Sequence, residues 1–342
     1  MSTDPHACAA GPRPLLSICI ATRQRCAALA ETLMALAAQM PSDGRVEVVV
    51  ADGASGDGTA AMLARQAGQW PWLRWLVLAE NGGVDRDYDR CVAAAAGEWC
   101  WLFTDDDLPH PQAIARICAA LMPARDLVVI DAEVRDRDCR TVLRAAQLPW
   151  PADRELLGDD PALLPLLGQH LTFIGATIIR RAVWCERDRE RYYGSLFIHV
   201  GVIFQRPLAG RVAVLAGPLV AIRYGIGGWT PRRALVWLRL WPELIWSFTA
   251  WPERARAQVT PRYPWRNPAR LLPLRALGAL DAGFVAQHLE RRISWPAWAM
   301  AWLIARLPRP PLRWALRAAH VILRRPGGRI ARYDLALATT PG

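Results

Sequence analysis

The sequence predicts an α/β fold with a doubly wound, mostly parallel sheet, followed by a basic, Trp-rich region of amphipathic helices. Three observations support this prediction. Short apolar runs alternate with segments of helical periodicity over the first two thirds of the chain. Polar and acidic residues follow each of these runs. Beyond residue 228 the net charge becomes strongly positive and Trp becomes frequent. A chain of 342 residues is long enough to bury a large core.

Four apolar runs are expected to form the strands. They occupy residues 15–21, 46–52, 73–80 and 98–107, and the segments between them, at 27–40, 59–68 and 87–97, have helical periodicity. Continuous apolar runs are typical of strands that are buried on both faces. Because parallel strands need a crossover, and a helix usually supplies it, this alternation predicts a parallel sheet.

Polar side chains follow all four predicted strands at their carboxyl ends. They are Thr22 and Arg23, then Asp52, Ser55 and Asp57, then Asn81, Gly82 and Asp85, and finally Asp105, Asp106 and Asp107. Ligands of such sheets bind at this edge. Asp57 also suits a helix cap, and that alternative stays open. Three adjacent carboxylates repel one another, so the last group is either a solvated turn or the binding site of a cation.

No glycine-rich phosphate loop follows the first predicted strand, since neither GxxxxGK[ST] nor GxGxxG occurs there. The diphosphate of a bound nucleotide would have to be held in another way. A divalent cation that bridges carboxylate and phosphate oxygens is the obvious candidate.

The charge is distributed unevenly along the chain. Residues 1–228 carry 23 Arg against 26 Asp and Glu, whereas residues 229–342 carry 19 Arg against 5, which gives net charges of about −3 and +14. Ten of the 17 Trp residues also lie in the second part. Nucleic-acid binding is disfavoured, because the Arg residues lie among Trp and Leu stripes and no zinc, helix-turn-helix or RNA-binding signature occurs.

The basic part is expected to form cationic amphipathic helices at residues 230–241 and 311–325. Thr230 is expected to cap the first helix and Pro242 to kink or end it. An apolar stretch at 293–305 is shorter than the roughly 20 residues of a membrane-spanning helix. Cationic helices that carry Trp are typical of a membrane-interfacial region, and the alternative is that they pack on the preceding domain.

The cysteine content and the N-terminal sequence predict a cytoplasmic protein. Its eight Cys lack CxxC pairs or metal-ligand spacing, so we expect reduced thiols. The N-terminus lacks the basic-then-apolar order of a signal peptide. From the patterns above we predict a disordered lead-in at residues 1–13, an α/β domain at 14–228 and a basic helical, membrane-interfacial region at 229–342.

The blocks LSICIATRQR, VVVADGASGDGT and ENGGVDRDYDRCVAAAAGEWCWLFTDDDLPHPQAI resemble successive motifs of family 2 glycosyltransferases with the GT-A fold. The resemblance covers about residues 15–225 and is closest to the abequosyltransferase-like branch. It implies a metal-dependent transfer of a sugar from a nucleotide-sugar donor to a polyprenyl-linked saccharide. Such a reaction belongs to bacterial O-antigen or exopolysaccharide biosynthesis, at the inner face of the cytoplasmic membrane.

The resemblance also implies roles for individual residues. Asp52 would contact the base or ribose, Asp85 would line the nucleotide pocket, and Asp105 or Asp106 would face the ribose. Asp107, with Asp105, would bind Mg²⁺ or Mn²⁺. The first block departs from the family's usual Pro-Thr-Tyr-Asn, because the chain has Ala-Thr-Arg-Gln at 21–24. Thr22 stays a candidate donor contact, and Arg23 could stack on the base or meet the diphosphate.

The catalytic base is less clear from the sequence. Family members usually carry Glu-Asp where this chain reads FIHVG at 197–201, so His199 is the candidate base, with acceptor positioning or a structural role as alternatives. A retaining mechanism would need no such base. Arg223, Arg232 and Arg233 are candidate helpers for the leaving group. Two other functions stay open: a nucleotidyltransferase, and an inactive nucleotide-sugar-binding or membrane scaffold protein.

Overall fold

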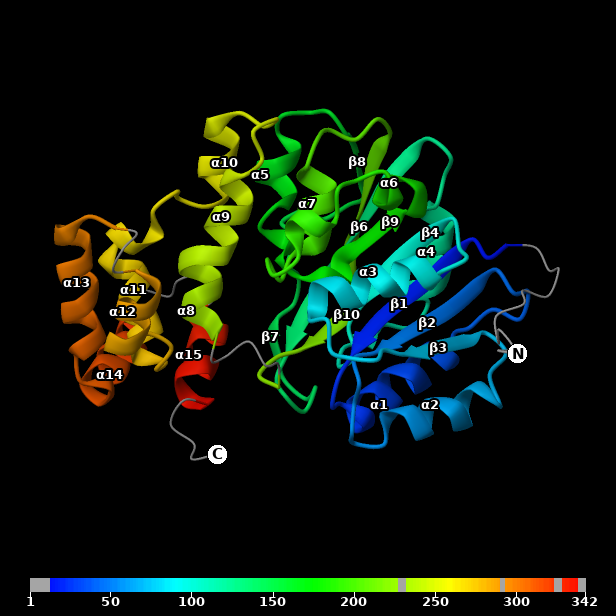
Figure 1. Cartoon of the computed structure of the whole chain (residues 1–342), viewed down its shortest axis with the longest axis horizontal. Coiled ribbons are helices and arrows are strands. Elements are labelled where there is room, and N and C mark those ends of the chain that lie inside the picture. Colours follow the sequence, from blue (N-terminus) through cyan, green and yellow to red (C-terminus); the bar gives the residue numbers. More distant parts are fainter. Residues whose placement is uncertain (1–12, 227–231, 290–292, 323–327, 338–342) are drawn as a thin grey trace.

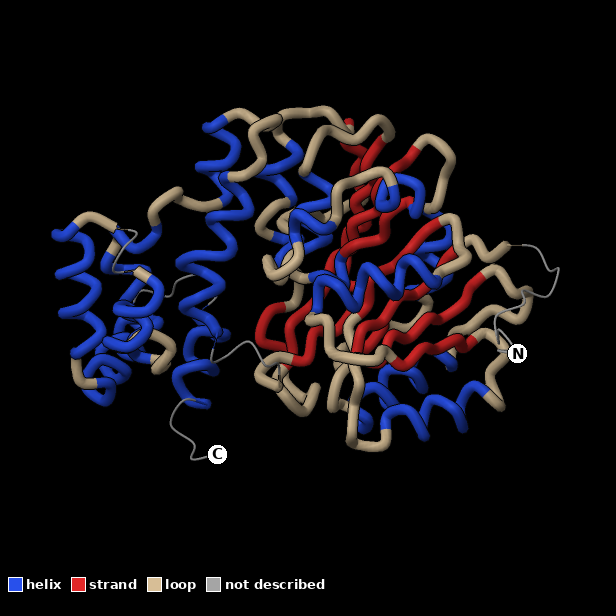
Figure 2. Tube along the Cα trace, in the orientation of Figure 1, coloured by secondary structure: helices blue, strands red, loops and turns tan. Residues whose placement is uncertain are grey.

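A ten-stranded mixed sheet forms the centre of the computed structural model, which describes residues 13–226, 232–289, 293–322 and 328–337 (Figures 1 and 2). The strands are β1 (Leu16–Thr22), β2 (Val46–Asp52), β3 (Leu73–Val77), β4 (Trp99–Phe103), β5 (Leu108–Pro109), β6 (Arg125–Arg135), β7 (Val142–Arg144), β8 (Arg154–Leu157), β9 (Thr177–Arg180) and β10 (Arg211–Arg223). Their order is β3-β2-β1-β4-β9-β6-β10-β5, with β7 beside β6 and β8 beside β10.

The four strands expected from the sequence form the parallel half of this sheet. β1 pairs in parallel with β2 and β4, and β2 pairs in parallel with β3. In this register Thr22 lies opposite Asp52 and Ile20 lies opposite Phe103. Three strands therefore end together, and the polar residues that follow them meet at one edge.

The second half of the sheet is mixed. β9 runs antiparallel to both β4 and β6, whereas β6 and β10 are parallel to each other. β5, directly after the three Asp residues, pairs antiparallel with β10. This pairing draws the acidic segment toward the carboxyl end of β10.

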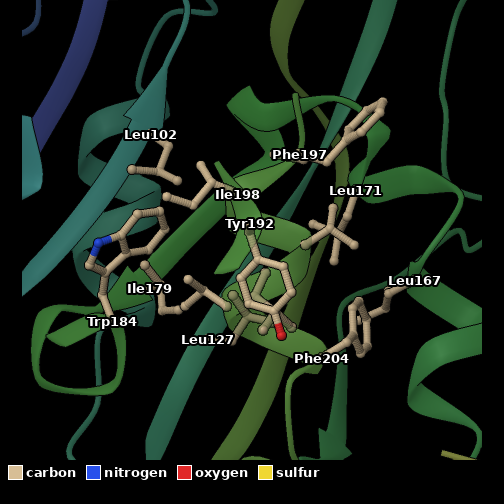
Figure 3. Close-up of a cluster of buried hydrophobic side chains, with 14 of the residues drawn as sticks. Leu102, Leu127, Leu167, Leu171, Ile179, Trp184, Tyr192, Phe197, Ile198 and Phe204 are labelled. Carbon is tan, nitrogen blue, oxygen red and sulfur yellow. The ribbon is translucent and has the colours of Figure 1, made fainter. Parts of the chain in front are cut away.

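Helices cover both faces of the sheet. They are α1 (Cys26–Ala37), α2 (Thr59–Ala67), α3 (Val84–Ala94), α4 (Ala113–Ala120), α5 (Leu163–Leu167), α6 (Arg181–Cys185) and α7 (Ile198–Phe204). Apolar residues of α1, α2 and α4 form a core on one face. On the other face α3, α5, α6 and α7 contribute to a second core, part of which is drawn in Figure 3. Burial of each Leu or Ile in such cores contributes about 1.5–3 kcal/mol.

The C-terminal helices are α8 (Arg233–Leu235), α9 (Trp241–Trp246), α10 (Glu253–Val259), α11 (Pro268–Ala276), α12 (Ala282–His288), α13 (Trp295–Arg306), α14 (Arg309–Ile322) and α15 (Gly328–Leu337). No helix among the described residues is long and apolar enough to cross a membrane. The predicted lead-in, apart from Arg13, and the predicted cap at Thr230 lie outside the described residues.

The first C-terminal helix is amphipathic as expected, and most of its apolar face is buried inside the protein. Val236 and Trp241 join the core of the sheet domain, whereas Ala234 and Leu238 join a separate core formed with α11, α12 and α13. A π-helical stretch over residues 236–240 connects α8 directly to α9. The helix therefore continues through Pro242 instead of ending there. The wider π turn precedes a residue that lacks an N–H group and clashes with a regular helix.

Candidate active site

The candidate site lies where β1, β2 and β4 end. Thr22, the last residue of β1, donates a hydrogen bond through Oγ1 to Asp105 Oδ2 at 2.8 Å. The Thr22 carbonyl also accepts a hydrogen bond from the Gly53 N–H, directly after Asp52. The structure thus brings together side chains from two of the predicted polar groups, 83 residues apart in the chain.

The three consecutive Asp residues have different surroundings. Asp107 is 3% exposed, and its carboxylate accepts hydrogen bonds from Thr104 Oγ1 and from the Arg223 N–H, the latter at 2.8 Å. Burial, and next the charge of Asp106, raise the pKa of Asp107 well above its usual value. Oδ2 thus bonds within the turn that follows β4, whereas Oδ1 joins this turn to the end of β10; the predicted metal contact of Asp107 stays a prediction.

Arg25 neutralises the other two Asp residues. Its guanidinium Nη1 lies 3.4 Å from Asp105 Oδ1 and forms a hydrogen-bonded ion pair with Asp106 Oδ2. Burial, and next Asp106, still raise the pKa of Asp105 to about 6, against the opposing effects of Arg25 and Thr22. Two carboxylates are thus held close together with partial charge compensation, and the triple Asp is not a freely solvated turn.

Sequence reasoning selected Arg23 and missed Arg25. Arg23 is exposed, and it lies close enough to Asp87 to lower the pKa of that carboxyl, although burial raises the pKa overall. Between the two Arg residues, Gln24 has a left-handed backbone with φ of 55°. This conformation redirects the chain. The segment TRQR contains both residues, and no sequence signal distinguished them.

Asp52 lies at the same edge and is fully buried. Its Oδ1 accepts a hydrogen bond from the Ser55 N–H at 3.1 Å, while Oδ2 has no hydrogen-bond partner among the described residues. An unpaired buried carboxylate oxygen is costly unless a ligand or water satisfies it. This oxygen could accept a hydrogen bond from a bound nucleotide, and the contact of Asp52 with the base or ribose stays a prediction.

Asp57 serves as a helix-start residue, the alternative that the sequence left open. Its Oδ1 accepts a hydrogen bond from the Thr59 N–H at the start of α2, and Oδ2 accepts one from the Cys26 N–H at the start of α1. The Thr59 hydroxyl also donates a hydrogen bond to Oδ1, and this bond, followed by the one from Cys26, lowers the pKa of Asp57. Ser55 Oγ accepts a hydrogen bond from the Gln24 N–H at 2.8 Å, so the two loops are joined a second time.

Asp85 does not face the cluster described above. It is buried, and its carboxylate accepts three backbone hydrogen bonds, from Gly194, Leu196 and Ile198 at 2.8, 2.8 and 3.0 Å. Leu196 has a positive φ of 68°, which helps these N–H groups to converge. Burial raises the pKa of Asp85 to about 6. Asp85 thus anchors the loop before α7, a role that its sequence position beside Asn81 and Gly82 did not indicate.

His199 is enclosed in the core of α7. It is 1% exposed, and its Nε2–H donates a hydrogen bond to the Leu171 carbonyl at 2.7 Å. Its Nδ1 has no partner among the described residues, and burial lowers its pKa to about 4. Figure 3 shows the surrounding cluster, with Leu171 and the neighbours Phe197 and Ile198 labelled. A base must reach the acceptor hydroxyl, so this placement favours the structural alternative.

Two of the three Arg residues that were expected to assist the leaving group form ion pairs within the protein. The Arg223 side chain pairs with Glu31 at 2.6 Å, in addition to its backbone bond to Asp107. Arg233 pairs with Asp334 of α15 at 2.7 Å, and Arg232 is exposed. The carboxyl end of β10 is thereby linked to α1, whereas α8 is linked to the last helix.

Residues 17–184 match the sequence model of Glycosyl transferase family 2. Abequosyltransferase RfbV of Salmonella typhimurium strain LT2 is 27% identical to the chain over 202 residues, which cover 55% of this chain and 60% of that protein. The chain thus spans less than two thirds of the length of this relative.

Two solved structures show the same fold. S. aureus TarS 1–349 in complex with UDP has a TM-score of 0.55 at 17% identity, and the match covers 96% of this chain and 93% of that chain. The mannosyltransferase PcManGT from Pyrobaculum calidifontis, in complex with GDP-Man and Mn²⁺, has a TM-score of 0.54 at 18% identity, with coverage of 96% and 86%. The α/β GT-A fold expected from the sequence is therefore confirmed. The family match over residues 17–184, together with the identity to abequosyltransferase RfbV, shows that this region of the chain is similar to the family 2 glycosyltransferases.

Proposed function

We propose that the cluster of Thr22, Arg25, Asp105 and Asp106 binds the diphosphate end of a nucleotide-sugar donor. The observation that carries this proposal is the pair of adjacent, partly neutralised carboxylates at the carboxyl edge of a parallel sheet. Ligands of such sheets bind at this edge. The TarS and PcManGT structures are complexes with UDP and with GDP-Man and Mn²⁺, which supports a nucleotide-sugar donor.

The reaction is proposed to depend on Mg²⁺ or Mn²⁺. No group of three or more His, Cys, Asp or Glu side chains suited to a metal ion occurs among the described residues. Asp105 and Asp106 fit the alternative arrangement, in which one or two carboxylates hold the ion and substrate phosphates complete its shell. A bound cation would supply charge neutralisation for the departing diphosphate. Asp107, the other predicted ligand, accepts one hydrogen bond at each oxygen and keeps a second lone pair on each, so it stays a candidate ligand.

The other residues of the edge would bind and orient the donor. Asp52 offers an unpaired carboxylate oxygen to the base or ribose. The acceptor hydroxyl would attack the anomeric carbon as the bond to the diphosphate breaks. Arg25 would then interact with the negative charge that develops on the leaving group.

The acceptor is proposed to be a polyprenyl-linked saccharide of O-antigen or exopolysaccharide biosynthesis. The enzyme would reach it as a peripheral protein on the inner face of the cytoplasmic membrane. The similarity to abequosyltransferase RfbV and the excess of Arg beyond residue 228 support this proposal.

An inactive donor-binding protein is the second candidate. The burial of His199 favours it, because the stretch 197–201 then offers no exposed base. A retaining mechanism would also remove the need for that base. An active enzyme would bind the nucleotide-sugar donor and also turn it over, whereas the inactive protein would only bind it.

The first experiment measures thermal unfolding of the full chain with UDP-, GDP-, CDP- and dTDP-sugars, with and without Mn²⁺. We expect one nucleotide class to raise the melting temperature in a metal-dependent manner. The Asp106→Asn variant should lose this shift, whereas the matched control Asp159→Asn, at an exposed position after β8, should keep it.

Turnover is then followed as release of the nucleoside diphosphate in the presence of a lipid-linked acceptor fraction. Asp106→Asn should reduce kcat/KM by roughly 100-fold or more, since it removes charge at the reacting phosphates. Binding without any turnover would favour the inactive alternative. An unchanged melting temperature with every donor would refute the proposed site.

A further inference from the structure

Helix α13 is apolar on all sides, although it lies at the surface. Its sequence WPAWAMAWLIAR contains one charged residue, Arg306. One face, with Ala297, Ala301 and Ile304, is buried against α11 and α12. A helix that is apolar all round is normally buried on every side, in a protein core or a membrane.

The opposite face of α13 exposes large apolar side chains. Trp295 is 75% exposed and Leu303 is 62% exposed. Residues 295, 299, 302, 303 and 306 fall on one side of the helix because of its 3.6-residue period. The Arg306 guanidinium lies over the Trp302 ring, 3.5 Å from its centroid, on this same side.

Helix α14 also exposes a large apolar side chain. It begins three residues after α13 ends, and its Trp314 is 74% exposed. Arg313 and Arg317 instead donate hydrogen bonds to the backbone carbonyls of Ala276 and Leu335. The arrangement differs from the one expected for this helix, because these two Arg side chains are half-buried and the Trp points outward.

The charge of the segment indicates which partner would cover this surface. Residues 293–322 contain four Arg and no Asp or Glu; Arg313 and Arg317 bond within the protein, whereas Arg306 is exposed. Trp and Arg together suit the headgroup level of an anionic membrane, where the indole rings are partly buried and the guanidinium groups meet lipid phosphates. By contrast, the large apolar side chains exposed on the sheet domain, such as Met34 and Leu157, are aliphatic and lie on different elements.

We propose that the exposed face of α13, with Trp314 of α14, lies in the interface of an anionic lipid bilayer. At 12 residues, α13 is roughly 18 Å long and would lie along the membrane surface instead of crossing it. The inference deepens the proposed function, since it rests on the membrane contact proposed there and assigns it to a defined surface.

The position of the C-terminal helices suits this role. In Figure 1 α13 and α14 lie at the end of the molecule away from the sheet, and α15 lies between them and the sheet. Tyr224, directly after β10, donates a hydrogen bond to Asp334 of α15 at 3.0 Å. The C-terminal helices thus join the sheet domain near the carboxyl end of β10, the edge at which Asp107 is held. A membrane-held acceptor would approach from this side.

The test is co-sedimentation of the full chain with vesicles of equimolar phosphatidylglycerol and phosphatidylcholine, compared with phosphatidylcholine alone. We expect wild-type protein to prefer the anionic vesicles. The double substitution Trp295→Ala and Leu303→Ala should weaken binding by about tenfold or more, because it removes two large apolar side chains from the interface. Leu157→Ala, at a 55% exposed position on β8, is the matched control and should bind like the wild type.

Folding and donor binding are measured on the same samples. Melting temperatures and donor-induced shifts should be unchanged in the double variant, since both positions are exposed and outside the candidate active site. Equal vesicle binding by the double variant and the wild type would overturn the assignment to α13, and the transferase proposal would stand. Absence of wild-type binding to anionic vesicles would overturn the membrane contact itself. If the wild type self-associates without vesicles and the double variant does not, a second copy of the chain covers this face and the proposal is wrong.

Discussion

Replacing His199 with Gln should remove a defined part of the pH dependence of folding stability. The imidazole is buried and neutral in the folded chain, where its pKa is lowered to about 4 from the ordinary 6.5. As the pH falls below about 6.5, the unfolded chain binds a proton that the folded chain does not. The folded state therefore loses stability between about pH 6.5 and pH 4.

The magnitude follows from these two pKa values. Linkage gives a loss of about 2 kcal/mol at pH 5 relative to pH 8 from this one side chain. His170 is half-buried, and burial lowers its pKa although the hydrogen bond from Nε2–H to the Ile130 carbonyl, at 2.8 Å, opposes this; its lowered pKa acts in the same direction. This contribution is present in both proteins, and it cancels when the variant is subtracted from the wild type.

The assay is urea unfolding of wild type and His199→Gln at pH 5 and pH 8, followed by circular dichroism. At pH 8 the variant should be less stable, because it loses the packed ring and perturbs the bond to Leu171. This difference should shrink by about 2 kcal/mol at pH 5. A difference that stays constant between the two pH values would refute the reasoning, since it would mean that His199 is hydrated in solution.

The same variant tests the base assignment. Loss of a general base lowers kcat by roughly 100- to 10,000-fold. A residue that only supports the core should leave kcat per folded molecule within about tenfold of wild type. We expect the smaller effect.

Two further substitutions test contacts that position the site. Asp85→Asn should lower the unfolding free energy by about 1–3 kcal/mol, because the carboxylate accepts three backbone hydrogen bonds. Hydrogen exchange of the Gly194 and Ile198 amides should accelerate in this variant. Unchanged exchange would contradict the anchoring role of Asp85. Trp241→Ala should cost about 3–5 kcal/mol, since the ring is 1% exposed and packs edge-on against Phe197. The Trp237→Ala control, at a 37% exposed position, should cost clearly less. Equal losses in urea unfolding would mean that α9 does not pack as described.

The sequence alone was sufficient to predict the parallel half of the sheet and the edge at which its polar residues gather. Apolar runs such as 46–52 can only be satisfied by burial on both faces, and the structure has β2 over those same residues. Parallel strands that end together bring their following residues to one edge, so Thr22, Asp52 and Asp105 could be grouped in advance. These inferences depend on local periodicity and on the direction of the strands, which the sequence carries directly.

The tertiary structure decided what each polar residue does. Asp105, Asp106 and Asp107 are indistinguishable in the sequence, yet only Asp107 meets the Arg223 N–H, which lies 116 residues further along the chain. The donors for Asp85 are likewise more than 100 residues away. Arg25 and Arg23 differ in their surroundings because Gln24 between them has a left-handed backbone.

In the basic C-terminal region, residues 229–342, the sequence likewise predicted the helices but not what they contact. Its periodicity predicted amphipathic helices, and a helical stripe does not reveal what it packs against. The apolar stripe of α9 is buried inside the protein, whereas α13, set aside in the sequence as too short to span a membrane, exposes Trp295 and Leu303. Exposure is a property of the assembled chain, because it depends on which other segments cover a side chain. The sequence determined which elements form and where their polar ends meet; the folded arrangement determined which charges are paired and which apolar faces remain open.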